Sequence, residues 1–366
     1  MRHLKLLAAF ATLPLTLLFT GCGGNSSAKG GGGGSGGQTT TIYFVGQIYS
    51  AEEWQLASGS STATATALPA PSGSPGSVAA YAIAASGSNV FVAGSVGTGP
   101  GHQGAAYWLN GTVTMLPMPA GMTDSAALGI AVSGSDVDAV GYVTGNPNGR
   151  IAAYWMNGTV TELPLPSGMV DSTAVGIAVS GSNVYVVGWA GASGNGGSAV
   201  CWTNGAPTML SAPSGMGSPM ANAIAVSGSN LYVVGSAGNS ALLWVNGAAT
   251  TLPTPTGGGD AVPTAIAVSG NDVYVAGYTA ASAAYWVNNG TTTTVTALPL
   301  PSGALWATTG GIAVSSGDVY VSGWVENSTP GGGSTAVYWK NGGPAMTLPS
   351  PTDLPSFAYA VAVSTQ

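Results

Sequence analysis

Few side chains in this chain have the chemistry that catalysis requires. The sequence contains two histidines, and one of them lies at position 3, ahead of an apolar N-terminal run. His102 is therefore the histidine left for acid–base work, and the glycine-rich stretch around it does not form a nucleophile elbow. A single histidine also excludes the usual multi-histidine metal sites. We predict that the protein is not an enzyme and carries no cofactor.

Three aspartates recur at one place in an internal repeat. Asp124, Asp171 and Asp260 each stand three residues after a glycine, in segments predicted to connect repeats. Such carboxylates could bind Ca²⁺ together with backbone oxygens. However, the chain has no Asp-x-Asp-x-Asp-Gly spacing and no pair of acids placed for glycoside hydrolysis. Capping of loops through Asx turns is the favoured interpretation, and a metal site is the weaker one.

Aromatic residues gather near the same connections. Tyr142, Trp189, Tyr278 and Trp324 each follow a glycine that is predicted to end a strand, and Trp306 lies in a predicted connection. Their rings could stack on sugar faces or clamp an apolar ligand. The favoured interpretation is that they cover the edges of blades and pack against neighbouring loops. Both interpretations remain open, and the five residues are the candidate ligand-binding set.

Another set of tryptophans recurs once in each repeat, which predicts packing rather than ligand binding. The set is Trp108, Trp155, Trp202, Trp244, Trp286 and Trp339, and in the first repeat, which lacks the Asn-Gly turn, Trp54 is expected to take the same role.

Two residues depart from the repeat. Cys201 stands directly before such a tryptophan, where most repeats have tyrosine, and is predicted to be a buried packing residue. Asp138 stands where most repeats have Tyr or Phe. Because a buried lone carboxylate is costly, Asp138 either lies at a partly hydrated position or has a partner.

The repeated unit consists of four short apolar runs. In residues 223–252 these are Ala-Ile-Ala-Val-Ser, Leu-Tyr-Val-Val, Leu-Leu-Trp-Val and Ala-Ala-Thr-Thr-Leu. The runs are rich in strand-forming residues, and the Ser-Gly-Ser-Asn and Asn-Gly segments between them are turn signals. The prolines that follow lack the amide hydrogen of a ladder. The unit therefore predicts four antiparallel strands, A to D in chain order.

The period of the repeat predicts the fold class. A glycine after strand B recurs at intervals of 42–48 residues, at Gly46, Gly94, Gly141, Gly188, Gly235, Gly277 and Gly323. Four strands in about 40–50 residues is typical of a propeller blade. We predict an all-β fold, a seven-bladed β-propeller of four-stranded blades over residues 41–366. Residues 360–364 form a strand A without a strand B after it, so they are predicted to pair into the N-terminal blade and close the ring.

The N-terminus has the features of an export signal over residues 1–21. Two basic residues precede an apolar run over residues 6–19. This run is shorter than a typical transmembrane helix. The segment Leu18-Phe19-Thr20-Gly21-Cys22 resembles a bacterial lipobox, from which Phe19 is a departure. This resemblance implies cleavage before Cys22 and its acylation with palmitate-type chains, which would anchor the protein to the outer membrane. An ordinary secreted protein is the alternative.

Composition limits the partners. Residues 22–40 include an unbroken glycine run and are predicted to be a flexible linker. From Cys22 onward the chain has three basic side chains, Lys29, Arg150 and Lys340, against twelve acidic ones. So few cations cannot neutralise many phosphates, which argues against nucleic acid. We expect a monomer that meets the membrane through its lipid anchor.

The repeat motifs resemble those of a known group. Tyr-Trp-x-Asn-Gly occurs within residues 105–117 and 152–164, and Val-Tyr-Val-x-Gly occurs at 273–277 and 319–323. In these motifs the chain is similar to exported bacterial repeat proteins with extracellular HAF-type repeats. The resemblance implies export and a propeller, and it brings no functional residues with it.

The sequence therefore favours a non-catalytic binding or adhesion module of the cell envelope. Its ligand, a glycan, a peptide or a protein, would bind the loop face, which we define as the face formed by the variable B–C and D–A connections. A purely structural envelope scaffold is the alternative, and a polysaccharide-active enzyme is less favoured.

Overall fold

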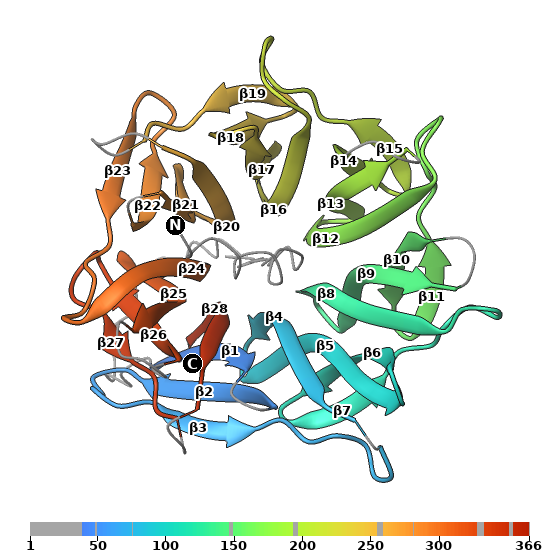
Figure 1. Ribbon diagram of the computed structural model, residues 1–366, viewed down its shortest axis with the longest axis horizontal. Helices are drawn as coiled ribbons and strands as arrows, with labels where there is room; N and C mark the ends of the chain where they lie inside the picture. The colour runs from blue at the N-terminus through green and yellow to red at the C-terminus, as the bar shows by residue number, and fades with distance from the viewer. Residues whose placement is uncertain are drawn as a thin grey trace, which may run out of the picture.

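The computed structural model describes residues 39–47, 50–74, 76–145, 149–192, 197–254, 259–280, 282–327, 333–350 and 354–365. These residues form seven four-stranded antiparallel sheets around a central axis, so the predicted seven-bladed propeller is confirmed (Figure 1). Cys22 and nearly all of the predicted linker lie outside the described residues. Among the residues described, no helix is long and apolar enough to cross a membrane.

Each blade contributes one strand to each of four concentric positions. Blade 1 is β28-β1-β2-β3, and blades 2 to 7 follow in chain order from β4 to β27. The innermost strands, A, are β28 (Phe357–Thr365), β4 (Val78–Ser86), β8 (Asp124–Ser133), β12 (Asp171–Ser180), β16 (Pro219–Ser227), β20 (Ala261–Ser269) and β24 (Ala304–Ser315). The B strands are β1 (Thr40–Gln47), β5 (Asn89–Gly99), β9 (Asp136–Thr144), β13 (Asn183–Gly191), β17 (Asn230–Ala237), β21 (Asp272–Thr279) and β25 (Asp318–Asn327).

The two outer positions complete the blades. The C strands are β2 (Ala51–Ala57), β6 (His102–Leu109), β10 (Arg150–Met156), β14 (Ser198–Thr203), β18 (Ser240–Val245), β22 (Ala283–Asn288) and β26 (Ser334–Lys340). The D strands are β3 (Thr64–Ala67), β7 (Thr112–Met115), β11 (Thr159–Glu162), β15 (Ala206–Met209), β19 (Ala248–Thr251), β23 (Thr293–Ala297) and β27 (Met346–Thr347).

The ring closes through both ends of the propeller. β28 pairs antiparallel with β1, from Thr40 opposite Thr365 to Gln47 opposite Phe357. The predicted closure is therefore confirmed, and the pairing extends beyond the predicted residues 360–364. Because β1 has β28 on one side and β2 on the other, neither edge of β1 is left unpaired.

Burial falls from the centre outward. The inner strand β12 is buried at all but its two end residues, whereas most of the outer strand β11 is exposed. The inner strands are rich in Ala, Gly and Val because strands of neighbouring blades contact each other there. Most outer turns follow the predicted chemistry. Asn246 and Gly247 both have positive φ, 50° and 85°, which is the type I′ geometry that suits a two-residue hairpin.

The same tryptophan hydrogen bond recurs between every pair of neighbouring blades. The recurring tryptophan of strand C is at most 1 % exposed in every blade, so its predicted packing role is confirmed. Its Nε1–H donates to a backbone carbonyl just after strand D of the preceding blade, at 2.6–2.9 Å. The pairs are Trp54–Pro349, Trp108–Pro69, Trp155–Pro117, Trp202–Pro164, Trp244–Ser211, Trp286–Pro253 and Trp339–Pro299.

We predict that Trp54→Phe destabilises the propeller by about 2–4 kcal/mol. The substitution removes the hydrogen bond to Pro349, leaves that carbonyl without its donor, and opens a small void where the larger ring packed. Equilibrium urea unfolding measures the change. Trp306→Phe is the matched control, because Trp306 is 47 % exposed and its substitution should change stability by less than about 0.5 kcal/mol. Equal effects of the two substitutions would contradict the role given to the hydrogen bond.

Candidate functional site

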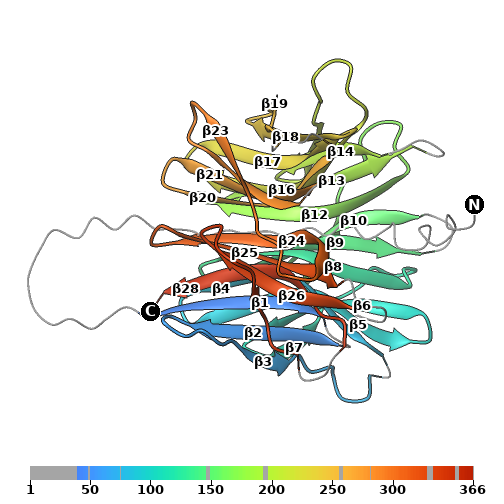
Figure 2. The same cartoon turned by 60° about the vertical axis from the view of Figure 1, so that its left-hand side comes forward.

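The alternating strand direction gives the propeller two different faces. The B–C and D–A connections lie on the loop face, and the A–B and C–D turns lie on the opposite face, which we call the hairpin face. Figure 2 shows the strands running between the two faces. The candidate ligand-binding residues belong to the loop-face half of the molecule.

Strand B does not end at its glycine, so one expectation from the sequence was wrong. β13, for example, runs through Gly188 and ends at Gly191. Trp189 is therefore a strand residue, paired with Thr173 on one side and Ala199 on the other. The same holds for the equivalent aromatic residues of three other blades, Tyr142, Tyr278 and Trp324. These four rings belong to the sheets and not to loops, while their role in ligand binding stays a prediction.

Strand B can continue past its glycine because strand A contains a β-bulge at that point. In blade 5 the register shifts between Ala221 and Ala223, opposite Gly235. A Cβ on Gly235 would lie 1.9 Å from the carbonyl oxygen of Met220, so only glycine allows the strands to approach this closely. A Cβ added to the equivalent glycine of any other blade would likewise lie 1.8–2.5 Å from a strand A carbonyl oxygen. Pairing can then continue towards the loop face.

Strand A also begins earlier than predicted. Asp124 and Asp171 are the first residues of β8 and β12, and Trp306 is the third residue of β24. These three residues were expected in connections, and that placement was wrong. Asp260 does lie in a connection, directly before β20.

Rings on strand B of blade 7 and on the inner strand of blade 1 pack together. The Trp324 ring lies 5.5 Å from that of Phe357 and 5.7 Å from that of Tyr359, edge to face in both cases. Phe357 and Tyr359 are stacked at 6.0 Å. Burial, together with the nearby Tyr81 of blade 2, raises the pKa of Tyr359 to about 12. The cluster therefore reaches towards blade 2.

A second cluster continues around the ring. Buried Tyr142, Leu128 and Val175 pack together, with partly buried Tyr81 and Trp189 against them. We call Trp324, Phe357, Tyr359, Tyr81, Tyr142 and Trp189 the aromatic arc, which extends from blade 7 through blades 1, 2 and 3 to blade 4. Sequence reasoning missed Phe357, Tyr359 and Tyr81. Tyr359 and Tyr81 are the bulged residues of their inner strands, a role that only the register reveals.

Polar contacts hold Tyr142 at the rim of the arc. Its hydroxyl accepts a hydrogen bond from Nε2 of Gln103 in the preceding blade, at 2.8 Å. The Arg150 guanidinium lies over its ring, 4.3 Å from the centroid. Burial raises the pKa of Tyr142, so its hydroxyl stays protonated at neutral pH. With 7 % exposure, Tyr142 supports the arc more than it presents a surface.

The other two candidate aromatics lie apart from the arc. Tyr278 is half-buried in β21, and burial and the nearby Asp260 raise its pKa. Trp306 is 47 % exposed, and Leu305 beside it is 65 % exposed. The structure thus brings Tyr142, Trp189 and Trp324 into one arc and does not bring Tyr278 or Trp306 into it.

The candidate metal ligands are not gathered into one place. Asp124 accepts hydrogen bonds from Thr123 and from the Gln103 amide, and it lies 3.2 Å from Nδ1 of His102. Burial alone would raise the Asp124 pKa, but these contacts outweigh it and lower the pKa. Within the described ranges, no group of three or more His, Cys, Asp or Glu side chains could hold a metal ion. Asp124 acts as a cap between blades 2 and 3.

Asp138 has a partner. Its side chain is 3 % exposed, and the Tyr154 hydroxyl donates a hydrogen bond to its Oδ1 at 2.5 Å. Burial raises the Asp138 pKa, as does the nearby Asp136, while the hydrogen bond from Tyr154 acts in the opposite direction. Of the two possibilities that the sequence left open, the structure supports the partner.

Cys201 is a packing residue, as predicted. It is 4 % exposed in β14, and burial raises the pKa of its thiol to about 11. A protonated, enclosed thiol is a poor nucleophile.

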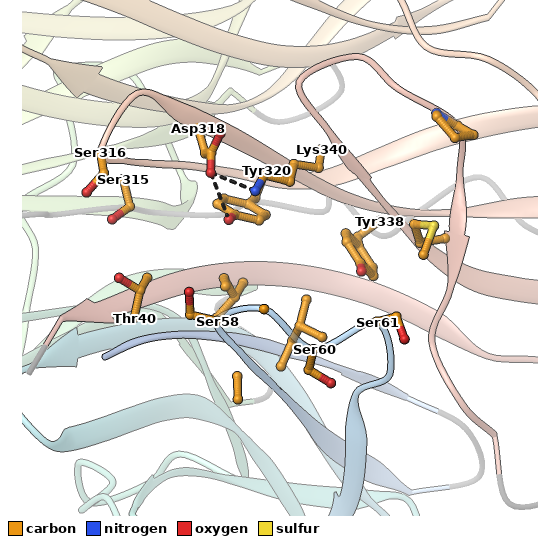
Figure 3. Close-up of a pocket in the computed structure, with 16 residues that line it drawn as sticks. Thr40, Ser58, Ser60, Ser61, Ser315, Ser316, Asp318, Tyr320, Tyr338 and Lys340 are labelled. Carbon is orange, nitrogen blue, oxygen red and sulfur yellow. Dashed lines mark hydrogen bonds and ion pairs between the residues drawn. The ribbon is translucent and has the colours of Figure 1, made fainter. Parts of the chain in front are cut away.

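A cavity of about 470 Å³ lies on the opposite, hairpin face, between blades 7 and 1. Figure 3 shows Asp318, Lys340 and two tyrosines of blade 7 on one side, facing hydroxyl groups of blade 1 on the other. A groove of about 440 Å³ lies at the equivalent place between blades 2 and 3. Sequence reasoning placed candidate ligand-binding residues on the loop face alone and missed both cavities.

Comparison with known proteins adds no family to this description. No protein-family model matches the chain, and no curated protein is significantly similar to it. The fold and the sites therefore stand on the chain's own residues.

We predict that Asp138→Asn stabilises the protein at pH 7. Because burial raises the native pKa, the folded state holds this proton more tightly than the unfolded chain, and stability falls as pH rises through that window. The amide cannot ionise and still accepts the Tyr154 hydrogen bond. Urea unfolding from pH 3 to pH 7 should show the gap between the variant and the native protein widening with pH.

Tyr154→Phe provides the opposing variant. It removes the hydrogen bond that favours the Asp138 carboxylate, so it should lower stability most at neutral pH. If the difference in unfolding free energy between Asp138→Asn and the native protein does not change with pH, this would contradict a raised pKa of Asp138.

Proposed function

We propose that the protein is a non-catalytic binding module of the bacterial cell envelope, whose ligand binds at the loop face beside the aromatic arc. The observation that carries this proposal is the arc itself, in which six aromatic residues from five consecutive blades lie on strands A and B towards the loop face. A propeller is compatible with such a role, since a rigid ring can present a binding surface at its centre.

The composition of the arc suits a ligand with both apolar and polar groups. Trp189, Trp324, Tyr81 and Tyr359 are only partly buried, so part of each ring remains accessible. Across the ring, the bulged residues are polar: Asn222 donates a hydrogen bond to the Pro263 carbonyl. In blade 6 the bulged residue is Thr264. The Thr264 hydroxyl is buried and bonded to Thr309, so the partly buried Asn222 is the polar group that stands opposite the aromatic faces, an arrangement that fits a glycan or a peptide.

A structural envelope scaffold is the second candidate. The observation in its favour is the exposed apolar pair Leu305 and Trp306. Leu300, in the same stretch of the chain, is also exposed, at 37 %. Exposed apolar residues that lie together are typical of protein contacts. A polysaccharide-active enzyme is less favoured, and Asp124 does not suit the role of general acid, because its contacts lower its pKa whereas a general acid needs a raised pKa.

Binding should depend on the arc. The screen looks for a glycan, or a component of an envelope extract, that shifts the intrinsic tryptophan fluorescence of the full chain. We expect Trp189→Ala or Trp324→Ala to lower the affinity for that ligand at least about tenfold. The reason is that each substitution removes a partly exposed ring from the proposed surface. Met156→Ala is the control, because Met156 ends a C strand on the hairpin face and is 47 % exposed.

Urea unfolding of each variant separates lost binding from lost folding. Unchanged affinity in both folded arc variants would contradict the loop-face site. The scaffold would be favoured if no glycan shifts the fluorescence and the protein instead retains an envelope protein. Trp306→Ala should then abolish this retention.

Anchoring should depend on Cys22. We expect the full chain, expressed in a bacterial host, to be recovered with outer membranes and to partition into detergent, because two or more acyl chains hold a protein stably at a bilayer. Cys22→Ser should release it into the soluble fraction, and metabolic labelling with palmitate should disappear. The matched control Cys201→Ser keeps the anchor, since that buried thiol is not a lipidation site. Labelling that survives in Cys22→Ser would contradict the lipobox interpretation.

A further inference from the structure

The cavity between blades 7 and 1 has an apolar floor and a polar rim. Tyr320 and Tyr338 of blade 7 and Ile42 and Leu56 of blade 1 line its floor and are buried. The rim carries the side chains of Asp318 and Lys340, which are 38 % and 48 % exposed, and a series of hydroxyl groups. The hydroxyl groups belong to Thr40, Ser58, Ser60, Ser61, Ser315 and Ser316 (Figure 3).

The two charges of the rim compensate each other. Lys340 Nζ lies 2.7 Å from Asp318 Oδ2, and Asn341 donates a hydrogen bond to Asp318 Oδ1 at 2.8 Å. The Tyr320 ring lies below the ammonium group, 5.4 Å from its centroid. These contacts lower the pKa of Asp318 and raise that of Lys340, so both groups are charged at neutral pH. The rim therefore offers a strong donor and a strong acceptor without net charge.

The equivalent groove between blades 2 and 3 has a similar shape but lacks the charged side chains. It has nearly the same volume, and Phe91 and Tyr107 occupy the places of Tyr320 and Tyr338. At the places of Asp318 and Lys340, however, it has Asn89 and Leu109. The propeller geometry thus creates a groove at both junctions, and the ion pair is particular to the junction of blades 7 and 1.

We propose that the cavity between blades 7 and 1 binds a neutral oligosaccharide of about disaccharide size. A volume of about 470 Å³ lies within the usual range of small-ligand sites, about 300–1,000 Å³. A sugar has a C–H face that fits an apolar, tyrosine-lined floor, and its hydroxyls can donate to Asp318 while accepting from Lys340. An anion would meet the carboxylate and a cation the ammonium group, so a neutral polyol suits the paired charges best.

Saturation-transfer NMR on the full chain in mild detergent tests the proposal. The probes are maltose, cellobiose and N,N′-diacetylchitobiose, with glucuronate and glycylglycine as the anionic and zwitterionic comparisons. We expect at least one disaccharide to bind with millimolar affinity or better. In the double variant Asp318→Asn/Lys340→Leu its affinity should fall at least about tenfold. The variant introduces the residue types that blade 2 has at these places, so the repeat itself accommodates them.

Asp136→Asn/Met156→Leu is the matched control, because these residues hold the same places in blade 3, away from the cavity. Its binding should equal that of the native protein. No binding of any of the three disaccharides at about 10 mM, or equal binding in the Asp318→Asn/Lys340→Leu variant, would overturn the proposal. Stronger binding of glucuronate or glycylglycine would overturn the neutral class. A disaccharide lost in Trp324→Ala but retained in the cavity variant would belong to the loop face instead.

Discussion

The hydrogen bond from the strand C tryptophan to a carbonyl of the preceding blade is the interaction on which the propeller depends. A tryptophan at most 1 % exposed would otherwise leave its indole N–H without a partner, at a cost of about 1–3 kcal/mol. Six of the seven acceptors are proline carbonyls, at a place where strand D has ended and the carbonyl is free of the ladder. Trp54 forms this contact with Pro349, so the same interaction that spaces the blades also closes the ring.

A second constraint acts inside each blade and decides where functional side chains lie. The bulge opposite the strand B glycine keeps strands A and B paired beyond that glycine, towards the loop face. Side chains that follow the glycine therefore stand on rigid sheet and pack against the next blade, as Trp324 does against Phe357. Residues held on strands keep their geometry better than residues on loops, which makes the aromatic arc a preorganised surface.

Much of the fold could be predicted from the sequence, because the period, the turn residues and the complementary ends all point to one ring. The bulge could not, since a recurring glycine after an apolar run signals a strand end as readily as a close approach of backbones. The Asp138–Tyr154 contact was within reach, because strands B and C pair in every blade and tyrosine recurs on strand C. The arc was not, because Tyr81 and Tyr359 meet Tyr142 and Trp324 only after the blades have been placed around the axis.

Sevenfold repetition also explains where individual chemistry can arise. Cavities of similar volume lie at the same place in two junctions between neighbouring blades, although different side chains line them. The tryptophan contact and the glycine bulge leave the residues at the groove free to differ, since neither device uses them. Lys340 could thus replace an apolar residue such as Leu109 and pair with Asp318 while the blade kept its strands. Departures from the repeat, and not the repeat itself, are therefore where binding specificity can be acquired in this molecule.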